Sequence, residues 1–472
     1  MIVMIEYSIP QEHYFRIHHV RPRFKGDIEN VLIFMATEIA GINDRYPKEE
    51  FDHLLNRAIR NYPGNSQLSE KTINNWRTEI SSLFGFIQKD DKFCWPGRRA
   101  IELAEKEDLI QAFKIFLYDF QYPGAHVKIQ YISELVSNGV HFKPAQYILN
   151  VLKYANNGIN SFIGISKAEA CHCIFNDLRV TRDNEGAEKT WNRIKNNRDS
   201  NLQYDLTGDV IRYAGDIIDY MEIANLLFQK IDGKYYLNTK EKDCIEYFCQ
   251  STSWFDEYDD LIFKRSADLD VIRKASNLWF AYVNRNIEGS VFSTNIQHLL
   301  DDPHQDGDSK GKTFRLNPNN FDFTNTKQIG DFGEALIHEH ECLKVKAGGR
   351  EDLVHLIKII PTQFAVGYDI LSVELNATKR YIEVKTTIST NPISFNRFHL
   401  TTNEWVTASG MEDRYFVYRL FISKKDARLV LIQNPVRLYK NDLIDMVPTN
   451  GADITFDPSK VGQNEELLNW VN

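Results

Sequence analysis

The chain has 472 residues, a formal net charge of −9, 43% hydrophobic residues and 26% charged residues. This balance is typical of a soluble globular protein, and the length predicts roughly two to four domains. Many DNA-binding domains are basic, so the negative charge counts mildly against nucleic-acid binding, but it permits a basic stripe on one face. No stretch approaches about 18 apolar residues, and the first ten residues lack a basic segment, so we expect neither a membrane span nor a signal peptide.

The six cysteines do not show the paired spacing of a structural zinc site. The triplet Cys171-His172-Cys173 is expected to be a set of small buried residues on a helix rather than a set of metal ligands. This use of cysteine favours a reducing, intracellular compartment.

Residues 28–62 show helical spacing, and a second helix is predicted to begin at Ser69, a residue suited to cap a helix N-terminus. The segment 87–97 alternates in polarity around a tight turn, which predicts a β-hairpin. Two helices followed by a hairpin is the order of a winged helix, in which one helix enters the major groove of DNA. The candidate DNA contacts in this module are Arg77, Lys89 and Lys92.

A similar order returns at residues 209–238, where a helical pattern through Phe228 precedes a hairpin with Asp232-Gly233 in its turn. We predict a second winged helix here, although an ordinary polar hairpin after a helix has the same pattern. The intervening segment 181–201 is polar and rich in Lys, Arg and Asn. It is either a solvated helix face or a DNA-contacting helix that presents Arg193, Lys195 and Arg198.

The Pro-, Gly- and Asp-rich stretch 301–318 predicts the main domain boundary. We therefore expect a recognition module at 1–130, a second module at 131–300 and a further domain at 318–472. In this last domain a helix is predicted to begin near Thr324 or Thr326, with Glu334 lying off its apolar face. Strands are predicted at 351–362, 367–374 and 380–387, the last two joined by a polar turn.

The segment Ile-Glu-Val-Lys at 382–385 carries the strongest chemical signal. Side chains two residues apart in a strand share a face, so Glu383 and Lys385 point together while Val384 points to a core. A carboxylate binds a hard cation, and a lysine beside it can orient water or offset charge on a phosphate. Asp369 would supply a second carboxylate and the Val384 carbonyl a third ligand.

Whether Asp369 lies on the same face as Glu383 depends on the register in which the two strands pair, because a shift of one residue moves each side chain to the other face. Pairing Leu371 with Glu383 would place Asp369 opposite Lys385, on the correct face, and pairing Ser372 with Glu383 would place it on the wrong face. We therefore expect an odd-numbered turn, or a bulge, near residues 376–378.

A helical glutamate, then an aspartate, then Glu-x-Lys in a strand resembles the order of the PD-(D/E)XK nuclease superfamily. More narrowly, GEALIHEHE, GYDILSV, YIEVKTT, FHLTTNEWVTA and RYFVYRL resemble, in this order, the NO VEIN C-terminal domain found in restriction and anti-phage proteins. The resemblance covers roughly residues 325–435. It implies an active site formed by Glu334, Asp369, Glu383 and Lys385, with an open role for Glu404 and Trp405.

The resemblance and the pattern together predict a multidomain chain. A mainly α N-terminal part with winged-helix modules would precede an α/β restriction-endonuclease-like domain. The expected function is sequence-specific, Mg²⁺-dependent hydrolysis of double-stranded DNA in a bacterial cytoplasm, with a homodimer favoured because one active site cuts one strand. Two alternatives remain open at this stage: an endonuclease that reads a modified base, and a DNA-binding protein whose nuclease fold is inactive.

Overall fold

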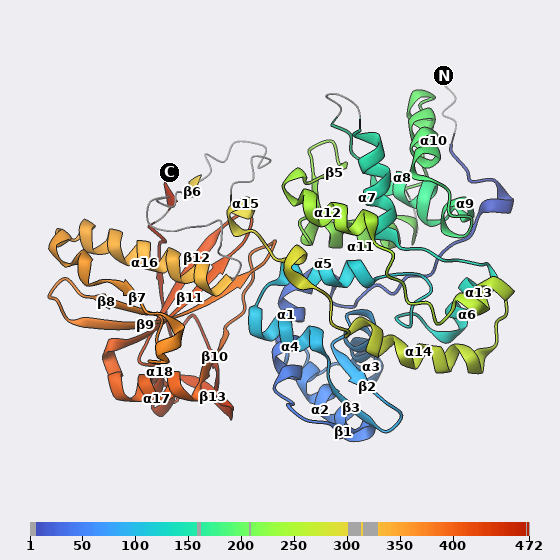
Figure 1. The fold of residues 1–472 in the computed structure, drawn as a ribbon. Coiled ribbons are helices and arrows are strands. Elements are labelled where there is room, and N and C mark those ends of the chain that lie inside the picture. Colours follow the sequence, from blue (N-terminus) through green and yellow to red (C-terminus); the bar gives the residue numbers. More distant parts are fainter. Residues whose placement is uncertain are drawn as a thin grey trace. The chain divides into compact units, whose positions relative to one another are not determined.

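The computed structural model describes residues 6–157, 162–206, 209–300, 313–314, 329–468 and 470–471 (Figure 1). Contacts divide the chain into two compact units. The first unit lies within Met1–Glu105 and Ile110–Phe292, and the second within Lys106–Leu109 and Ser293–Asn472. The predicted linker at 301–318 falls outside the described residues except for 313–314, and the predicted division of the first unit near residue 130 stays a prediction.

The first unit opens with three helices and a hairpin: the helical range predicted at 28–62 forms two helices, a third begins after Ser69, and the predicted hairpin follows. Ser69 caps its helix as expected, because its side chain accepts a hydrogen bond from the Thr72 amide. A short strand before the second helix joins the hairpin, so the sheet has three strands in the order β1-β3-β2. The elements are α1 (Ile28–Ala40), β1 (Tyr46–Pro47), α2 (Lys48–Asn61), α3 (Glu70–Thr78), η3 (Glu79–Leu83), β2 (Ile87–Lys89) and β3 (Phe93–Pro96).

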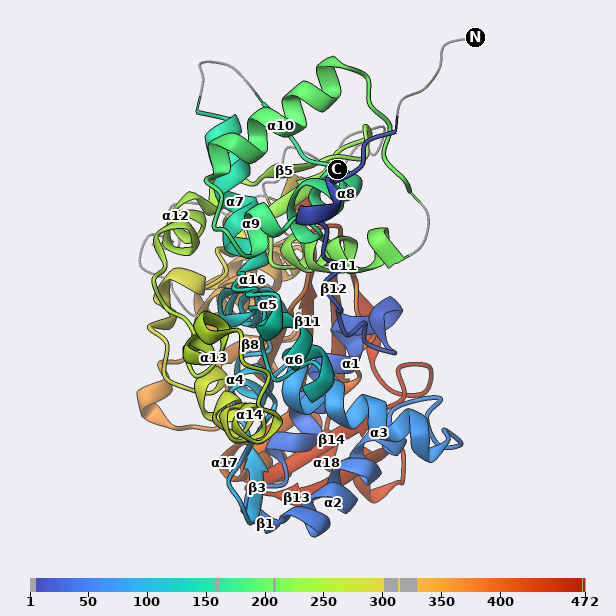
Figure 2. The ribbon, with the colours of Figure 1, turned by 90° about the vertical axis from the view of Figure 1, so that its right-hand side faces the viewer.

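The remainder of the first unit is mainly helical. Figure 2 shows α10 beside α7, which also contacts α12. The elements are α4 (Arg98–Lys106), α5 (Leu109–Asp119), α6 (Ile129–Ser137), α7 (Pro144–Ala155), α8 (Lys167–Ala170), η4 (Cys171–Phe175), α9 (Leu178–Thr181), α10 (Ala187–Asp199), α11 (Asp209–Ile223), β4 (Leu227–Gln229), β5 (Tyr235–Leu237), α12 (Lys242–Gln250), α13 (Asp259–Lys264) and α14 (Leu269–Val283).

The structure bears on three predictions for this unit. The helix expected through Phe228 ends earlier, at Ile223, because Asn225 adopts a left-handed φ of 59° and the next residues form strand β4. The hairpin with Asp232-Gly233 in its turn is confirmed as β4 and β5. Cys171 and Cys173 are buried in the helical segment η4, as expected for core residues.

The second unit is built on a mixed six-stranded sheet with the order β15-β12-β11-β9-β8-β7 (Figure 1). Its central strand β9 is antiparallel to β8 and parallel to β11. Helix α16 contacts β9 and β8 and so covers part of one face. The elements are α16 (Ile329–Ala347), β7 (Lys358–Ile359), β8 (Ile370–Val373), β9 (Lys379–Ile388), β11 (Tyr415–Ile422), β12 (Ala427–Gln433) and β15 (Gln463–Glu465).

A smaller antiparallel sheet accompanies this one, in the order β10-β14-β13. Helix α17 follows β10 and contacts β10, β14 and β11. It therefore connects the small sheet to the strand that lies next to β9. The elements are β10 (Arg397–Thr401), α17 (Thr402–Met411), α18 (Pro435–Lys440), β13 (Ile444–Thr449) and β14 (Gly451–Phe456). No described helix is both long and apolar enough to cross a membrane.

The strand predicted at 351–362 is mostly wrong. Residues Glu351–Leu356 form a 3-10 helix, and only Lys358–Ile359 pair as a strand. The physical reason lies in which side chains are buried: Leu353 and Ile357, one helical turn apart, face the core, whereas His355, which would share their face in a strand, is exposed. The start of the predicted helix near Thr324 or Thr326 lies outside the described residues.

The segment Lys106–Leu109 belongs to the second unit although it connects two helices of the first. Ile388, at the end of β9, donates its amide hydrogen bond to the Glu107 carbonyl at 2.9 Å. The Glu107 carboxylate contacts the Thr387 hydroxyl and lies 3.0 Å from Nη2 of Arg419, whose side chain is fully buried. The segment is thus fixed to the strand that carries Glu383 and Lys385.

Candidate active site

Strand β9 presents Glu383 and Lys385 on one face, as the two-residue spacing predicts. Lys385 Nζ donates a hydrogen bond to Glu383 Oε1 at 2.6 Å. The Glu383 side chain is only 4% exposed, whereas 23% of the Lys385 side chain is accessible. The pair therefore lies at the edge of the core, where an ammonium group can meet solvent or a bound phosphate.

Asp369 lies opposite Glu383 across the β8–β9 hairpin. Ile370 pairs with Ile382, and the Asp369 amide continues the ladder to the Ile382 carbonyl at 2.9 Å. The expected pairing of Leu371 with Glu383 is wrong, since Leu371 pairs with Tyr381. The observed register is shifted by two residues from the expected one, so Asp369 still lies on the same face of the sheet as Glu383.

The turn between these strands is odd-numbered, as predicted. Glu374 donates to the Thr378 carbonyl at 2.8 Å, which leaves Leu375, Asn376 and Ala377 as the turn. Ala377 adopts a left-handed φ of 70°, typical of the last position in a three-residue hairpin turn. This turn length sets the register that brings Asp369 to Glu383.

The Asp369 carboxylate also touches the backbone of β9. Its Oδ2 accepts a hydrogen bond from the Val384 amide at 2.8 Å. Burial raises the pKa of Asp369, and the Val384 amide and the Lys385 ammonium only partly offset that effect. The residue predicted as a metal ligand is thus already oriented by the strand that carries the other two predicted groups.

Glu334 reaches this cluster from helix α16. The helix approaches β9 closely at Gly333, where an added Cβ would lie 1.9 Å from the Thr386 hydroxyl oxygen. Gly333 therefore permits the contact that places the next residue near the site. Burial, followed by the charges of Asp369 and Asp331, raises the pKa of Glu334 to about 8.

Glu404 is a member of the site whose role the sequence reasoning left open. It lies in the first turn of α17, where its Oε2 accepts from the Thr401 amide at 2.9 Å and from Lys385 Nζ at 3.1 Å. Thr401 in turn caps the helix, completing a capping box. The Thr-x-x-Glu spacing after a strand was a signal for this helix start, but it did not reveal the bond to Lys385.

The electrostatics of the cluster are asymmetric. Burial raises the pKa of Glu383 well above its usual range, and the neighbouring Asp369 and Glu404 add to the increase. Burial acts to lower the pKa of Lys385, but the surrounding carboxylates outweigh it and the net pKa is raised. Burial acts to raise the pKa of Glu404, but the Lys385 ammonium and the hydrogen bond from the Thr401 amide together outweigh it, and the net pKa is lowered. Lys385 therefore remains a cation at neutral pH.

This donor set is compatible with a hard divalent cation. Several carboxylates are crowded in a partly buried place, and burial, reinforced by the neighbouring carboxylates, raises the pKa values of Glu334, Asp369 and Glu383. Within the described ranges, no three His, Cys, Asp or Glu side chains converge as a ready metal site. Mg²⁺ does not require such a cage, since it is usually held by one or two carboxylates and several waters.

Two of the three residues predicted to contact DNA in the first module have partners within their own unit. Arg77 forms an ion pair with Asp52 at 3.2 Å. Lys89 lies 4.1 Å from the centre of the Phe280 ring, and burial lowers its pKa. Lys92 is exposed at the hairpin tip. These positions leave Lys92 as the most accessible of the three predicted contacts.

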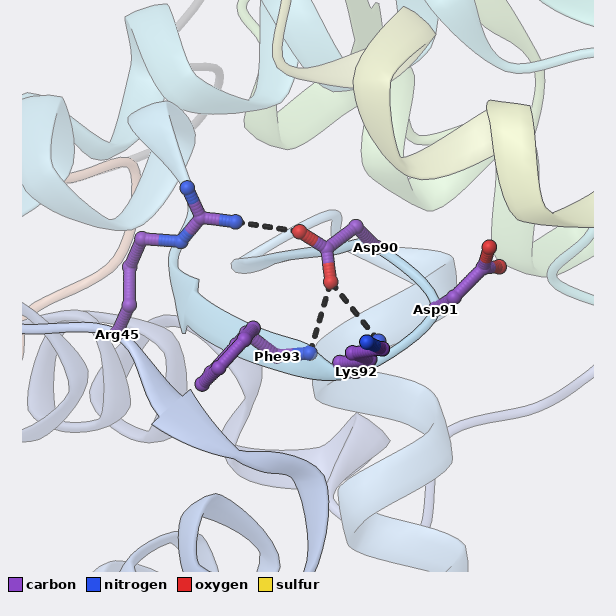
Figure 3. Close-up of a pocket in the computed structure, with 5 residues that line it drawn as sticks. All are labelled: Arg45, Asp90, Asp91, Lys92 and Phe93. Carbon is purple, nitrogen blue, oxygen red and sulfur yellow. Dashed lines mark hydrogen bonds and ion pairs between the residues drawn. The ribbon is translucent and has the colours of Figure 1, made fainter.

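Figure 3 shows the hairpin tip, where Asp90 is held by an ion pair with Arg45 and by the amides of Lys92 and Phe93. These residues and Asp91 line an open recess of about 550 Å³. The two aspartates balance the charges of Arg45 and Lys92, so the recess offers a phosphate backbone no net positive charge.

The three predicted DNA contacts of α10 differ in their surroundings. Arg193 pairs with Asp177 at 3.2 Å and with Glu185. Arg198 lies 2.6 Å from Glu169, whereas Lys195 is exposed. Both arginines therefore stabilise the first unit itself, and a contact of any of the three with DNA stays a prediction.

The comparisons with known proteins bear on both units. The family described as "Restriction endonuclease BpuJI - N terminal" matches residues 7–280, more than half of the chain. The chain belongs to this family. A second family, described as "Protein NO VEIN, C-terminal", matches residues 333–432, the range that contains Glu334, Asp369, Glu383, Lys385 and Glu404.

One curated protein and one solved structure are similar to parts of this chain. Protein NO VEIN of Arabidopsis thaliana is 28% identical over 135 residues, which is 28% of this chain and 5% of that protein. The chain thus spans a small part of that relative. A solved structure of the BpuJ1 endonuclease binding domain, in complex with pyrene- and phenanthrene-modified DNA, matches with a TM-score of 0.51. It is 23% identical and covers 59% of this chain and 100% of that chain, so it shows a shared fold.

Proposed function

We propose that the chain is a Mg²⁺-dependent DNA endonuclease of restriction or anti-phage type. The first unit would select double-stranded DNA, in keeping with its family and with the DNA complex of its structural neighbour. The second unit would cleave it. The observation that carries the proposal is the hydrogen-bonded pair Glu383 and Lys385, opposite Asp369 and beside Glu404.

The chemistry assigns a separate role to each group. Asp369 and Glu383, with the Val384 carbonyl, would hold Mg²⁺, which when bound polarises the phosphate and lowers the pKa of bound water. Lys385, as an ammonium, orients the attacking water and offsets charge that develops on the phosphate. Water attacks phosphorus in line, the bond to the 3′-oxygen breaks, and a 5′-phosphate and a 3′-hydroxyl result.

Glu334 and Glu404 support this arrangement in our proposal. Glu404, on helix α17, accepts a hydrogen bond from the Lys385 ammonium, and its charge helps to keep that group protonated. Glu334, with a pKa of about 8, carries a proton at neutral pH in the metal-free protein. A nearby divalent cation would favour its ionised form, so Glu334 would assist a second ion or orient Lys385.

The proposal also extends to the folds of the two units and to the oligomeric state. We infer that the second unit is a PD-(D/E)XK domain, since a helix with Glu334, a strand preceded by Asp369 and a strand with Glu383 and Lys385 occur in the order of that superfamily. We infer that α1, β1, α2, α3, β2 and β3 form a winged helix. A homodimer is proposed because one active site cuts one strand.

The decisive experiment is to sequence the ends of DNA fragments made by the purified chain with Mg²⁺. Discrete ends that vanish with EDTA and with Lys385→Ala are the expected result. Parallel digestion of methylated and unmethylated plasmid tests the reading of modified bases, and cleavage of only the methylated plasmid would replace unmodified DNA as the substrate. A chain that binds DNA but never cuts it with Mg²⁺ or Mn²⁺ would contradict the proposal and leave a binding protein.

A further inference from the structure

The turn of the second hairpin carries an exposed apolar side chain. Strand β4 ends at Gln229 and β5 begins at Tyr235, and Ile231 lies between them with 88% of its surface exposed. An isoleucine is disfavoured in a tight turn, where Gly, Asn and Asp predominate. It makes almost no contribution to the core, so its presence at the tip is not explained by the fold.

The turn around Ile231 is held in one conformation. The Asp232 carboxylate accepts from the Lys234 amide at 3.0 Å and from the Tyr236 hydroxyl at 2.6 Å. Lys230 and Lys234 close the turn through a backbone hydrogen bond of 3.0 Å, and Gly233 adopts the left-handed φ of 75°. The tip is therefore preorganised, and it directs Ile231 away from the unit.

Two lysines flank the apolar tip. Lys230 Nζ lies 4.2 Å from the centre of the Phe162 ring and 4.7 Å from that of Tyr236, which holds the ammonium near the base of the turn. Lys234 follows Gly233 on the other side and is partly exposed. An apolar side chain between two cations is complementary to a polyanion with an apolar interior, which describes duplex DNA.

The first hairpin supplies an internal comparison. Its turn contains Asp91 and Lys92, closed by the hydrogen bond from the Asp90 amide to the Phe93 carbonyl at 3.0 Å. The second turn is one residue longer, since it contains Ile231, Asp232 and Gly233. Both hairpin tips carry two lysines, Lys89 and Lys92 in the first and Lys230 and Lys234 in the second, but only the second has an apolar residue in the turn.

We propose that Ile231 inserts as a wedge into the minor groove of double-stranded DNA and partly unstacks one base step. Lys230 and Lys234 then contact the phosphates on either side. Side chains of this kind kink a duplex when they enter between bases, and neighbouring cations fix the position along the backbone. The inference rests on the proposed function, because it names how the first unit grips the DNA that the second would cut.

The test uses the full chain in EDTA, so that binding is measured without cleavage. The probe is a short duplex recovered from a random-sequence pool by the wild-type chain, with 2-aminopurine placed at each position in turn. The wild type should raise the fluorescence at one step. Ile231→Ala should abolish that rise and weaken binding about tenfold, whereas Ile231→Phe should retain the rise.

Matched variants separate the wedge from its cations. Lys230→Ala and Lys234→Ala should each reduce the salt dependence of binding by about one phosphate contact. Asp91→Ala, at the tip of the first hairpin, serves as the control and should leave the fluorescence rise unchanged. Because Ile231 is 88% exposed, its replacement should not alter the melting temperature.

The outcomes distinguish this inference from the proposed function. A wild type that binds duplex DNA without unstacking any step, or an Ile231→Ala variant with unchanged rise and affinity, would overturn the wedge alone. A wild type that binds no duplex at all would overturn the proposed function as well. If the wild type cleaves DNA and the Ile231→Ala variant binds DNA normally, the nuclease proposal stands and the wedge is refuted.

Discussion

Lys385 Nζ lies 3.1 Å from Glu404 Oε2 and 2.6 Å from Glu383 Oε1, so one ammonium joins a strand to the first turn of a helix. This relationship determines what the lysine can do. A group whose pKa is raised by two carboxylate partners is a poor general base near neutral pH. In the proposed reaction Lys385 therefore acts through its charge and its hydrogen bonds.

The first prediction concerns that charge. Lys385→Met should reduce the rate of DNA cleavage by about a hundredfold or more, because it removes a donor that stabilises transition-state charge. DNA binding, measured by fluorescence anisotropy in EDTA, should change little. Lys379→Met, at an exposed position of the same strand, is the control and should cleave normally. Equal activity of the two variants would remove Lys385 from the reaction.

The second prediction separates the two bonds of Glu404. Glu404→Gln removes the charge that helps to hold the Lys385 ammonium, and it should slow cleavage by about tenfold to a hundredfold. Thr401→Ala removes the cap of α17 and should lower the free energy of unfolding by about 1 kcal/mol with little effect on the rate. Single-turnover kinetics and thermal unfolding measure the two effects. If both variants slow cleavage equally, Glu404 acts only through the helix.

The third prediction concerns pH. The pKa of Glu334 is about 8 in the folded chain against an ordinary 4.5. Between these two pH values the folded chain therefore keeps a proton on Glu334 that the unfolded chain has lost. The stability contributed by protonated Glu334 is fully present below pH 4.5 and is lost as the pH rises through 8. Without metal, Glu334→Gln should therefore match the wild type near pH 5 and exceed its stability by about 1 to 2 kcal/mol near pH 9.

Thermal unfolding with and without Mg²⁺ checks this expectation. The excess stability of Glu334→Gln should shrink when Mg²⁺ is added, because a cation favours the ionised carboxylate. Glu351→Gln, at an exposed position of the same unit, is the control for loss of one carboxylate and should show no comparable change with pH. A pH-independent difference between wild type and Glu334→Gln would refute the assigned environment.

The fourth prediction concerns the contact between α16 and β9. Gly333→Ala would place a methyl group 1.9 Å from the Thr386 hydroxyl oxygen, so we expect a loss of about 1 to 3 kcal/mol in stability. Gly330→Ala, in the same helix with open space around its Cα, should instead stabilise by about 0.5 to 1 kcal/mol. A double-mutant cycle with Thr386→Ala should show partial rescue of Gly333→Ala.

The fifth prediction concerns the ion pair of Glu107 with Arg419. Glu107→Gln leaves a fully buried guanidinium without its carboxylate, which should cost about 3 to 5 kcal/mol. The double variant Glu107→Gln/Arg419→Met should recover much of that loss, since no buried charge remains. Glu105→Gln, at an exposed position two residues earlier, is the control. Chemical denaturation measures these variants and Arg419→Met alone, and additive losses in the double variant would argue against the pair.

Local pattern was sufficient for the centre of the candidate site. Alternation in Ile-Glu-Val-Lys predicted which side chains share a face, and side-chain parity placed Asp369 on the face of Glu383. The absolute register was not predictable, because the pattern repeats every two residues and only the three-residue turn selects one offset. The contribution of Glu404 depends on a tertiary contact that spacing along the chain does not encode.

The predicted DNA contacts show a second limit. Helix α10 buries Trp191 and Ile194 on one side, which its sequence pattern indicates. The pattern does not indicate that Asp177 and Glu169, from other elements, would meet Arg193 and Arg198. A basic residue on a polar helix face is therefore ambiguous until its neighbours in space are known.

The loop Lys106–Leu109 has a consequence for how the two units could be exchanged between related proteins. Because it lies in the second unit while its flanking helices lie in the first, the two units are joined at more than one point along the chain. If the second unit were joined to a different first unit by a single splice after residue 292, it would lack Glu107. Exchange between family members is then expected to conserve the loop together with its Arg419 counterpart, or to replace both at once.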